Sequence, residues 1–439
     1  MKLFGTIKDR GGARTYFFGI KVFEKKKLGH ARKNYILGIR VKKKRYAKEE
    51  KSHIQQRIES GLKLAAAEQK ILTMGLYYQN MPESERYVLC FDYLAHPYAE
   101  AIDAWTFFQY LQANGIPSKY VLRRENPLFL RLQQENKLQG ILPVSNELQL
   151  LTEYPHIIAQ SRMVISSFAF ELSAIFKHIP FIKYVFIEHG VTLMKERAIR
   201  YYSSSKFDGK LVPTSLTKNL YARLDPPTSS CSHYYCGFPR WDNLQPISRE
   251  RKMRKIFIFF TQRQTFRWDA THRPEYYRRI QSFVDRLREL YKDRSDIQLH
   301  IAMHHGLNEA TNHSSEDVIK GVNLVPMSEI STMVREADMC VTDFSSISFD
   351  FLYRDVPVIF YCFDLDIPYS NNTERSDLAA EKIDRLLYNG CRDEDSAVAK
   401  VQHYVNRNFE LEPEHIRKNE EIFWHRGNNC DQLWKAINE

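Results

Sequence analysis

Apolar and polar positions follow each other along most of the chain in the order expected of strands that alternate with helices. Short apolar runs, such as 87–91 and 256–260, are separated by segments in which apolar residues recur every three or four positions. Strands that alternate with helices predict parallel sheets. The polar and basic stretch 245–255 interrupts the series. We therefore predict an α/β protein with two Rossmann-like domains that face a cleft, at 81–248 and 249–439, the second of which ends in helices.

One predicted helix–strand–turn–helix–strand series, from Glu329 to Asp366, carries polar residues at its turn. Its first strand ends at Thr342-Asp343, and Ser345 and Ser346 are the predicted N-cap residues of the helix that follows. Ligands of open α/β sheets bind at the carboxyl ends of the strands, where the N-terminus of the next helix favours an anion. The two serines therefore either bind an anion together with that helix or only cap it.

Two histidines follow predicted strands in the same way, one in each half of the chain. His189 precedes Gly190 after an apolar run, and His304 follows the strand 297–303. A histidine, with an ordinary pKa of about 6.5, is the usual general base for a hydroxyl nucleophile. A loop histidine without a catalytic role is the alternative for each of them. No carboxylate lies near His304 at the spacing of a metal site, and the chain has neither a GxGxxG motif nor a P-loop.

The basic residues are concentrated in an N-terminal arm, which together with a following helix covers residues 1–80. Within 1–50, 16 Lys and Arg stand against 4 Asp and Glu, and because the whole chain has a net charge of +11, the remainder is close to neutral. The arm contains a repeat, and a cluster of basic residues follows each copy. Apolar residues interleaved with basic blocks favour an anionic membrane surface. The repeat is Tyr16-Phe17-Phe18-Gly19-Ile20-Lys21-Val22, which returns as Tyr35-Ile36-Leu37-Gly38-Ile39-Arg40-Val41.

We expect residues 1–48 to hold the protein peripherally at the inner face of the cytoplasmic membrane. The alternative is a pair of short hairpin strands with a solvated basic edge. A nucleic-acid partner is not expected, because the basic residues stay in the arm and no recognition motif accompanies them. Apolar positions from Ile54 to Leu76 predict a long helix that leads into the body.

The cysteines and the apolar runs favour a cytoplasmic location. The 7 cysteines are scattered and form no C-x-x-C pair, as expected in a reducing compartment and without a structural zinc site. No signal peptide is recognisable, and no uncharged apolar run reaches the ~18 residues needed to span a bilayer. We therefore expect no membrane-spanning segment.

Five short motifs, in this order and spacing, resemble the CDP-glycerol glycerophosphotransferase family. Enzymes of that family build teichoic acids and related phosphate-linked surface polymers on a two-domain fold of the GT-B type. The last of the motifs is the most specific. The motifs are His189-Gly190, Gly237-Phe238-Pro239-Arg240-x-Asp242, Thr261-x-Arg263, Met303-His304 and Thr342-Asp343-Phe344-Ser345-Ser346-x-x-Phe349-Asp350.

The resemblance implies a reaction and a set of site residues. His189 would deprotonate an acceptor hydroxyl that attacks CDP-glycerol and releases CMP, and His304 would contact the donor's phosphates as a second catalytic residue. The acceptor, a glycan or glycolipid such as a lipid-linked capsule or lipopolysaccharide saccharide, would bind the domain at 81–248, and the donor nucleotide the domain at 249–439. No metal ion or other cofactor would be obligatory. The implied donor-binding residues are Gly190, Arg240, Asp242, Thr261, Arg263, Thr342, Asp343, Ser345, Ser346 and Asp350.

The sequence departs from the family's motifs at several positions. Glu188 stands where the family has a tryptophan before the first histidine, and Ala302 replaces a basic residue two positions before His304. The proline usual before Thr261 is Phe260. These differences leave open whether CDP-ribitol replaces CDP-glycerol as the donor.

Two other functions remain open. A GT-B glycosyltransferase that uses a nucleotide sugar would share the fold, but it would more often show a glutamate or a basic pair at the donor phosphates than two serines after Thr-Asp. A non-enzymatic membrane scaffold would account for the basic arm, but not for the histidines and serines at strand ends. CMP release from CDP-glycerol, compared with UDP- and CMP-sugars, separates these functions.

Overall fold

The computed structural model describes the backbone of residues 4–9, 12–17, 20–28, 31–36, 39–41, 48–94, 102–168, 176, 179–194, 207–224, 229–244, 250–261, 272–303, 319–365 and 376–439. Within these ranges it describes side chains from Glu59 on, apart from 194, 223–224, 303, 327 and 376–380. The chain divides into two compact units. One consists of Met1–Pro97, Leu111–Val164 and Glu171–Lys183, and the other of Tyr98–Tyr110, Ile165–Phe170 and Tyr184–Glu439. The domain boundaries predicted at 80 and 248 stay predictions.

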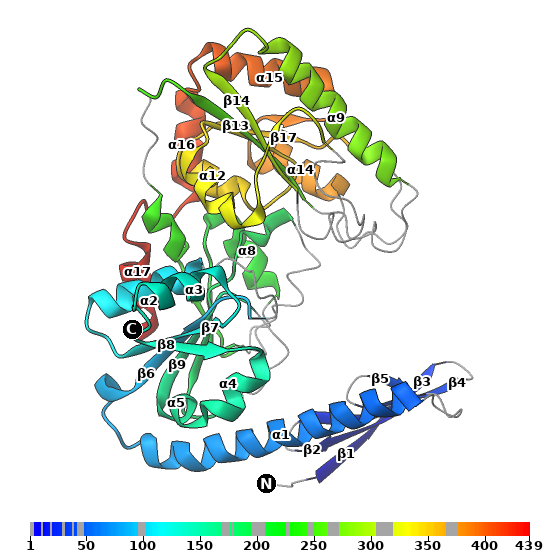
Figure 1. The fold of residues 1–439 in the computed structure, drawn as a ribbon, viewed down its shortest axis with the longest axis vertical. Helices are drawn as coiled ribbons and strands as arrows, with labels where there is room; N and C mark the ends of the chain where they lie inside the picture. The colour runs from blue at the N-terminus through cyan, green and yellow to red at the C-terminus, as the bar shows by residue number, and fades with distance from the viewer. Residues whose placement is uncertain are drawn as a thin grey trace. The chain divides into compact units, whose positions relative to one another are not determined.

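The N-terminal arm contains a five-stranded antiparallel sheet (Figure 1). Phe17 pairs with Ile20 and Ile36 pairs with Ile39, so each copy of the sequence repeat joins the two strands of a hairpin. The backbone of the arm is thus closer to the hairpin alternative, with five strands in place of two, whereas membrane binding stays a prediction. The strands, paired in sequence order, are β1 (Phe4–Asp9), β2 (Gly12–Phe17), β3 (Ile20–Leu28), β4 (Ala31–Ile36) and β5 (Ile39–Val41).

A long helix, α1 (Lys48–Tyr78), follows the arm as predicted and packs on two short helices of the same unit, α4 (Glu147–Glu153) and α5 (Pro155–Gln160). Its buried side chains include Ala65 and Ile71. Gly75 is required in this helix, because a Cβ at that position would lie 1.8 Å from the ring of Phe181. The same unit also contains the helices η1 (Glu83–Glu85) and α3 (Pro127–Gln134).

The first of two parallel sheets has seven strands in the order β12-β11-β10-β9-β6-β7-β8. The described pairs β6–β7, β7–β8, β10–β11 and β11–β12 are all parallel. Most positions in these strands are buried, as expected when helices cover a parallel sheet. The strands are β6 (Tyr87–Phe91), β7 (Ser118–Arg123), β8 (Ile141–Val144), β9 (Ser161–Ser166), β10 (Lys183–Phe186), β11 (Gly209–Leu211) and β12 (Ser232–Tyr234).

The second parallel sheet has six strands in the order β15-β14-β13-β16-β17-β18, and it lies entirely in the second unit. Every residue of β16 and β17 is buried, which explains why their sequences read as continuous apolar runs. β15 is shorter than the predicted strand, and β18 falls in a region that the sequence predicts as mostly helical. The strands are β13 (Arg254–Phe260), β14 (Ile297–Met303), β15 (Asn323–Leu324), β16 (Met339–Thr342), β17 (Val358–Tyr361) and β18 (Gly390–Cys391).

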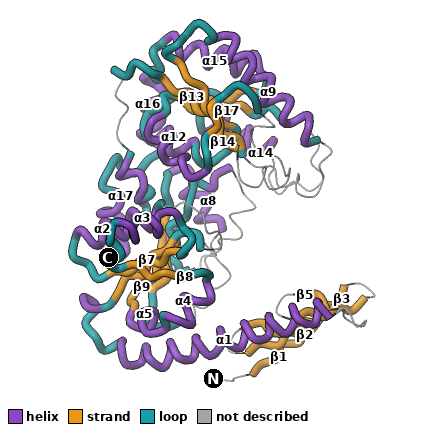
Figure 2. The backbone as a smooth tube through the Cα atoms, in the orientation of Figure 1, coloured by secondary structure: helices purple, strands orange, loops and turns teal. Residues whose placement is uncertain are grey.

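Helices flank the strands of both sheets (Figure 2). Two parallel sheets flanked by helices, with a helical C-terminus, confirm the predicted fold class. The remaining helices are α2 (Asp103–Ala113), η2 (Thr192–Met194), α8 (Ser215–Leu224), η4 (Pro239–Asn243), α9 (Arg273–Leu290), η6 (Met327–Glu329), α12 (Ile330–Glu336), α13 (Ser348–Tyr353), α14 (Ser376–Leu386), α15 (Glu394–Asn406), α16 (Pro413–Ile422) and α17 (Asn429–Asn438).

Candidate active site

A cavity of about 440 Å³ within the second unit brings together six of the predicted site residues from four different stretches of the chain. Side chains of α2 and α12 also line this cavity. Because these stretches are far apart in sequence, folding is needed to bring them together. The six residues are His189, Arg240, Thr261, Ser345, Ser346 and Asp350.

The imidazole of His189 is exposed at the turn that follows β10. It stacks on the ring of Phe168, with ring centroids 4.2 Å apart. Glu188, directly before it, has a left-handed backbone with a φ of 54°, and Gly190, directly after it, is buried. A Cβ at position 190 would lie 2.6 Å from the hydroxyl of Ser346, so the glycine allows the histidine turn to approach the serine turn.

Thr342 and Asp343 hold the ends of two neighbouring strands together. The Thr261 N–H donates to both oxygens of Asp343, at 3.1 Å each, and the Thr261 hydroxyl donates to Asp343 Oδ1 at 2.8 Å. The Thr342 hydroxyl donates to the carbonyl of Phe259. Of these four residues, Thr261 and Phe259 line the cavity, whereas Thr342 and Asp343 do not. Thr342 and Asp343 therefore influence the shape of the cavity only by holding Phe259 and Thr261 in place through these hydrogen bonds.

Ser345 and Ser346 are not the N-cap residues of α13, and this prediction is wrong. The helix begins one residue later than predicted, its N-cap is Ile347, and no side chain makes a capping hydrogen bond. The Ser345 hydroxyl accepts only a long contact of 3.5 Å from the Ile347 N–H. Since capping accounts for neither hydroxyl, the capping alternative loses its main support.

Arg240 is held between two carboxylates. Its Nη1 pairs with Asp103 and its Nη2 lies 2.9 Å from Asp350 Oδ1, which also accepts from the Trp241 indole at 2.6 Å. Burial by itself lowers the pKa of Arg240, but Asp103 and Asp350 outweigh burial and raise it. The guanidinium is therefore a fixed cation that joins η4 to α2 and α13. No sequence motif points to Asp103.

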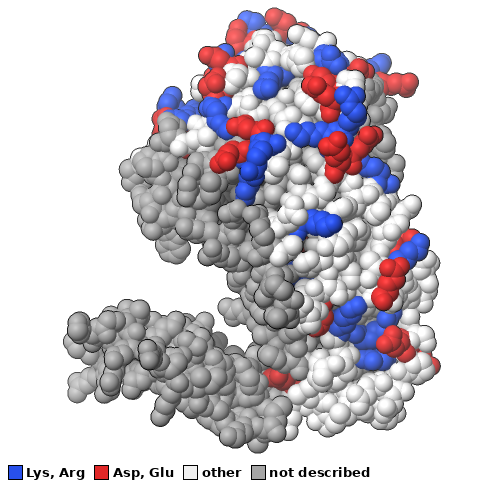
Figure 3. All heavy atoms as spheres, turned by 180° about the vertical axis from the view of Figure 1, so that it is seen from behind, with Lys and Arg blue, Asp and Glu red and all other residues white. Residues whose placement is uncertain are grey.

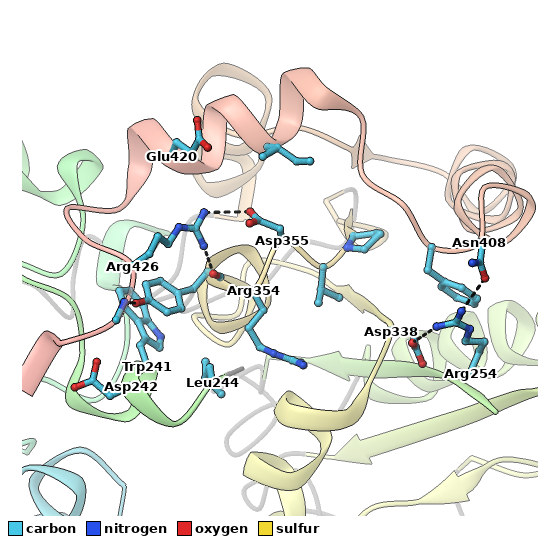
Figure 4. A pocket seen from close by; sticks show the side chains of 16 residues that line it. Trp241, Asp242, Leu244, Arg254, Asp338, Arg354, Asp355, Asn408, Glu420 and Arg426 are labelled. Atoms are coloured by element: carbon cyan, nitrogen blue, oxygen red, sulfur yellow. Dashed lines mark hydrogen bonds and ion pairs between the residues drawn. The ribbon is translucent and has the colours of Figure 1, made fainter. Parts of the chain in front are cut away.

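Asp242 does not line the cavity that contains His189. Its carboxylate accepts from the N–H groups of Asn429, at 2.7 Å, and Cys430, at 2.8 Å, and from the Asn429 side-chain amide at 2.9 Å. It therefore anchors the start of α17. Asp242 borders a second cavity of about 580 Å³, which also contains Arg254, Arg354 and Arg426 (Figure 4). A role for Asp242 in donor binding stays a prediction.

Two predicted residues, His304 and Arg263, lie outside the described part of the chain. Conversely, the cavity wall contains polar residues that sequence reasoning did not select. They belong to α2 and α12, which carry no family motif, so only the fold identifies them. They are Trp105, Thr106, Gln109, Ser331 and Arg335.

The described ranges contain no group of three or more His, Cys, Asp or Glu placed to hold a metal ion. None of the helices described there is long and apolar enough to cross a membrane. The cavity does offer an exposed imidazole, two serine hydroxyls and a fixed guanidinium. These groups suit proton transfer from a hydroxyl next to an anionic group.

The chain is similar in sequence to a known protein. The chain is 20% identical over 344 residues to the minor teichoic acid biosynthesis protein GgaB of Bacillus subtilis (strain 168), which is 74% of this chain and 37% of that protein. The chain thus spans little more than a third of this relative's length.

Solved structures show a similar fold. The wall teichoic acid polymerase TagF has a TM-score of 0.51 at 14% sequence identity, over 90% of this chain and 98% of that one. A substituted form of the same polymerase has a TM-score of 0.50 at 14% identity, with the same coverage of both chains.

A family model also matches this chain. The family model described as CDP-Glycerol:Poly(glycerophosphate) glycerophosphotransferase matches residues 133–410, which is more than half of the chain. The matched region contains the histidine turn, the serine turn and Arg240, whose side chains line one cavity. The chain therefore belongs to the CDP-glycerol:poly(glycerophosphate) glycerophosphotransferase family, a family of phosphate-transferring enzymes.

Proposed function

We propose that this protein transfers glycerol phosphate, or a similar polyol phosphate such as ribitol phosphate, from its CDP derivative to a hydroxyl of a surface-glycan acceptor, with release of CMP. The observation that supports this most is the approach of the His189 turn to Ser346, allowed by Gly190. His189, Ser345 and Ser346 line the same cavity, which supports a role for the imidazole as a base and for the two hydroxyls as hydrogen-bond donors. Family membership supports the same reaction class.

In the proposed reaction, His189 takes the proton of the acceptor hydroxyl as its oxygen attacks the phosphorus that carries the glycerol. A new phosphorus–oxygen bond forms, the bond to the CMP phosphate breaks, and CMP leaves with the electron pair. Ser345 and Ser346 donate hydrogen bonds to phosphate oxygens. Transfer of this kind depends mainly on positioning and charge stabilisation.

Arg240 contributes to the proposed site by holding neighbouring residues in position, and not by offering an unpaired positive charge to the substrate. Both of its carboxylate partners, Asp103 and Asp350, are buried and already neutralise it. We therefore propose that Arg240 holds Asp350, and the part of the cavity wall that Asp350 forms, in position. We further propose that no divalent cation is obligatory, because the serine hydroxyls and, on the family resemblance, His304 would contact the phosphates. Chelation that abolishes transfer would contradict this.

The acceptor and the location are parts of the same proposal. We propose a lipid-linked saccharide as the acceptor, and peripheral attachment to the inner face of the cytoplasmic membrane through residues 1–48. The 16 Lys and Arg among the first fifty residues support attachment to an anionic surface. Such attachment would bring the enzyme to a lipid-embedded acceptor.

The test uses purified full-length protein, a lipid-linked saccharide and a panel of donors. We expect CMP release and a phosphate-containing product with CDP-glycerol or CDP-ribitol, and neither product nor nucleotide release with UDP- or CMP-sugars. Transfer of a sugar from one of the latter would identify a glycosyltransferase. No transfer from any donor, in a protein that binds the membrane, would favour a scaffold.

A further inference from the structure

Glu188, the residue before His189, is a buried carboxyl on a strained backbone. Its φ of 54° lies in the left-handed region that residues other than glycine rarely adopt. Both of its carboxyl oxygens lack a hydrogen bond of ordinary geometry in the described structure. Backbone strain and unsatisfied buried groups cost stability, and they are found at functional sites where the surrounding structure holds them in place. Glu188 is therefore a candidate for a functional role.

Three other polar residues are buried next to Glu188. The charge of Lys210, on β11, and the hydroxyl of Thr192, on η2, both favour the ionised form of the Glu188 carboxyl. The Thr192 hydroxyl lies 3.1 Å from that of Tyr221, on α8, and the Lys210 ammonium lies 5.6 Å from the centre of the Tyr221 ring. All four side chains are buried and belong to the second unit. We call Glu188, Thr192, Lys210 and Tyr221 the buried polar cluster.

The two ionisable groups of opposite charge in this cluster are enclosed by protein. Figure 3 shows basic and acidic side chains interspersed at the surface of one face of the molecule, where water solvates them. Glu188 and Lys210, by contrast, are 1% and 0% exposed. Among the described residues Lys210 is the only charged group that shifts the pKa of Glu188, and burial outweighs it and raises that pKa to about 8. At neutral pH most Glu188 carboxyls are therefore uncharged.

The buried polar cluster includes residues at both ends of the turn that carries the catalytic imidazole. His189 lines the active-site cavity, and Gly190 allows the close approach to Ser346. Glu188 precedes these two residues and Thr192 follows them, and neither of the outer two lines the cavity. A change of charge in the cluster would therefore act on the position of the imidazole without any contact to a substrate.

A purely structural role explains only part of this arrangement. The family motif has a tryptophan at position 188, and a neutral side chain of that kind would fill the space without an unsatisfied carboxyl. Lysine is rarely buried completely, but Lys210 is enclosed beside the same carboxyl. Ionisable groups perturbed by burial and by a specific charged neighbour are typical of functional sites. Filling of space therefore leaves the presence of both groups unexplained.

We propose that Glu188 is a positioning residue of the transfer reaction: its uncharged carboxyl stays in the buried polar cluster and holds the His189 turn against Ser346, and its ionisation releases the turn. This inference rests on the proposed function and adds an upper pH limit to it. A buried carboxylate without hydrogen bonds is costly, and Lys210 offsets only part of that cost, so the ionised side chain moves toward water and the turn moves with it.

The kinetic test is the pH dependence of kcat for CMP release by the full-length protein. A histidine acts as a base in its neutral form, which predominates above its ordinary pKa of about 6.5, so wild type should give a bell-shaped profile whose upper limb lies near pH 8. Glu188→Gln does not ionise, so it should keep the lower limb and lose the upper one. Lys210→Met removes the charge that lowers the pKa of Glu188, so its upper limb should move to higher pH. An upper limb that persists unchanged in Glu188→Gln would overturn the proposal.

A variant without the side chain tests whether the carboxyl positions the turn. Glu188→Gly suits the left-handed backbone but removes the carboxyl, and it should lower kcat at neutral pH about tenfold with little change in the KM for CDP-glycerol. Glu188→Gln keeps the shape and should recover most of that kcat. Arg286→Gln removes an exposed arginine of α9 as a control and should keep the wild-type profile. A kcat of Glu188→Gly equal to that of wild type would contradict the positioning role.

A spectroscopic test needs no turnover, so it separates this inference from the proposed function. In full-length protein with isotope-labelled histidine side chains, the NMR signal of His189 is the one that His189→Ala lacks. We expect this signal to shift with pH in two steps, one from the imidazole itself and one near pH 8 from Glu188, and the second step to be absent in Glu188→Gln. A second step in both proteins, or in neither, would overturn the proposal. Both steps in wild type, without transfer from any donor, would refute the proposed function alone.

Discussion

At the level of single residues, the turn around His189 determines what its imidazole can reach. The family resemblance pointed to His189 and Gly190, but it could not reveal that Gly190 is needed for contact with Ser346. That contact joins residues more than 150 positions apart in the chain, and no local pattern records it. Glu188 was visible as a departure from the family motif, and the structure shows it buried in a left-handed conformation.

Glu188→Gln tests how much the buried carboxyl of Glu188 destabilises the folded protein. Both of its oxygens lack a hydrogen bond of ordinary geometry in the described structure, and burial raises its pKa to about 8 although Lys210 and Thr192 oppose the shift. Since its ordinary value is 4.5, the unfolded chain loses this proton first as the pH rises, and the folded protein loses stability between about pH 4.5 and 8.

Thermal melts of Glu188→Gln and wild type between pH 5 and 9 measure this effect. Glutamine keeps the shape but does not ionise, so the melting temperature of the variant relative to wild type should rise with pH and level off above about pH 8. A difference that stays constant over this range would show that the Glu188 carboxyl does not titrate in the folded protein as described.

At the level of elements, the apolar pattern predicted the strands of both sheets except β18, because parallel strands covered by helices are almost entirely apolar. The prediction of the N-cap failed at the polar turn before α13. The N-cap residue is Ile347, so Ser345 and Ser346 both lie before the cap position. The apolar pattern predicted a helix where α2 lies, but it did not reveal that Asp103 and Trp105 become site residues, because they do so only through tertiary packing.

The Asp103–Arg240–Asp350 group joins three of these elements, and removing its cation should be costly. Arg240→Met leaves two buried carboxylates without their shared partner, which predicts a loss of about 3–5 kcal/mol of unfolding free energy. Denaturant unfolding measures it. Arg286→Gln, which breaks the exposed pair with Asp395, should cost at most about 1 kcal/mol. Similar costs for both variants would mean that the buried group does not stabilise the fold.

At the level of the whole molecule, composition separated the basic arm from a nearly neutral body, and the fold confirms two parallel sheets. The repeat in the arm was evident in sequence, but its structural meaning as two hairpin connections depends on strand register. Membrane attachment, the acceptor and the location are not decided by the fold, because a basic antiparallel sheet suits several partners.

Substitutions in the full-length protein test the arm. Changing Lys25, Lys26, Lys27, Lys42, Lys43 and Lys44 to glutamine removes both lysine clusters and keeps the chain length. At about 1 kcal/mol for each cation near an anionic surface, flotation with anionic vesicles should fall sharply. Wild-type flotation should weaken with salt and be small with neutral vesicles. Equal flotation of both proteins would exclude the arm's charge as the anchor.

The central claim is that His189 is the base of a glycerophosphotransferase, and its most direct test is CMP release from CDP-glycerol by wild type and His189→Ala with a lipid-linked saccharide acceptor. Because the imidazole is exposed, the variant should melt at nearly the wild-type temperature. We predict acceptor-dependent CMP release by wild type and a rate ~10² to 10⁴ times lower in His189→Ala. A variant that folds normally and stays within a few-fold of wild type would contradict the account.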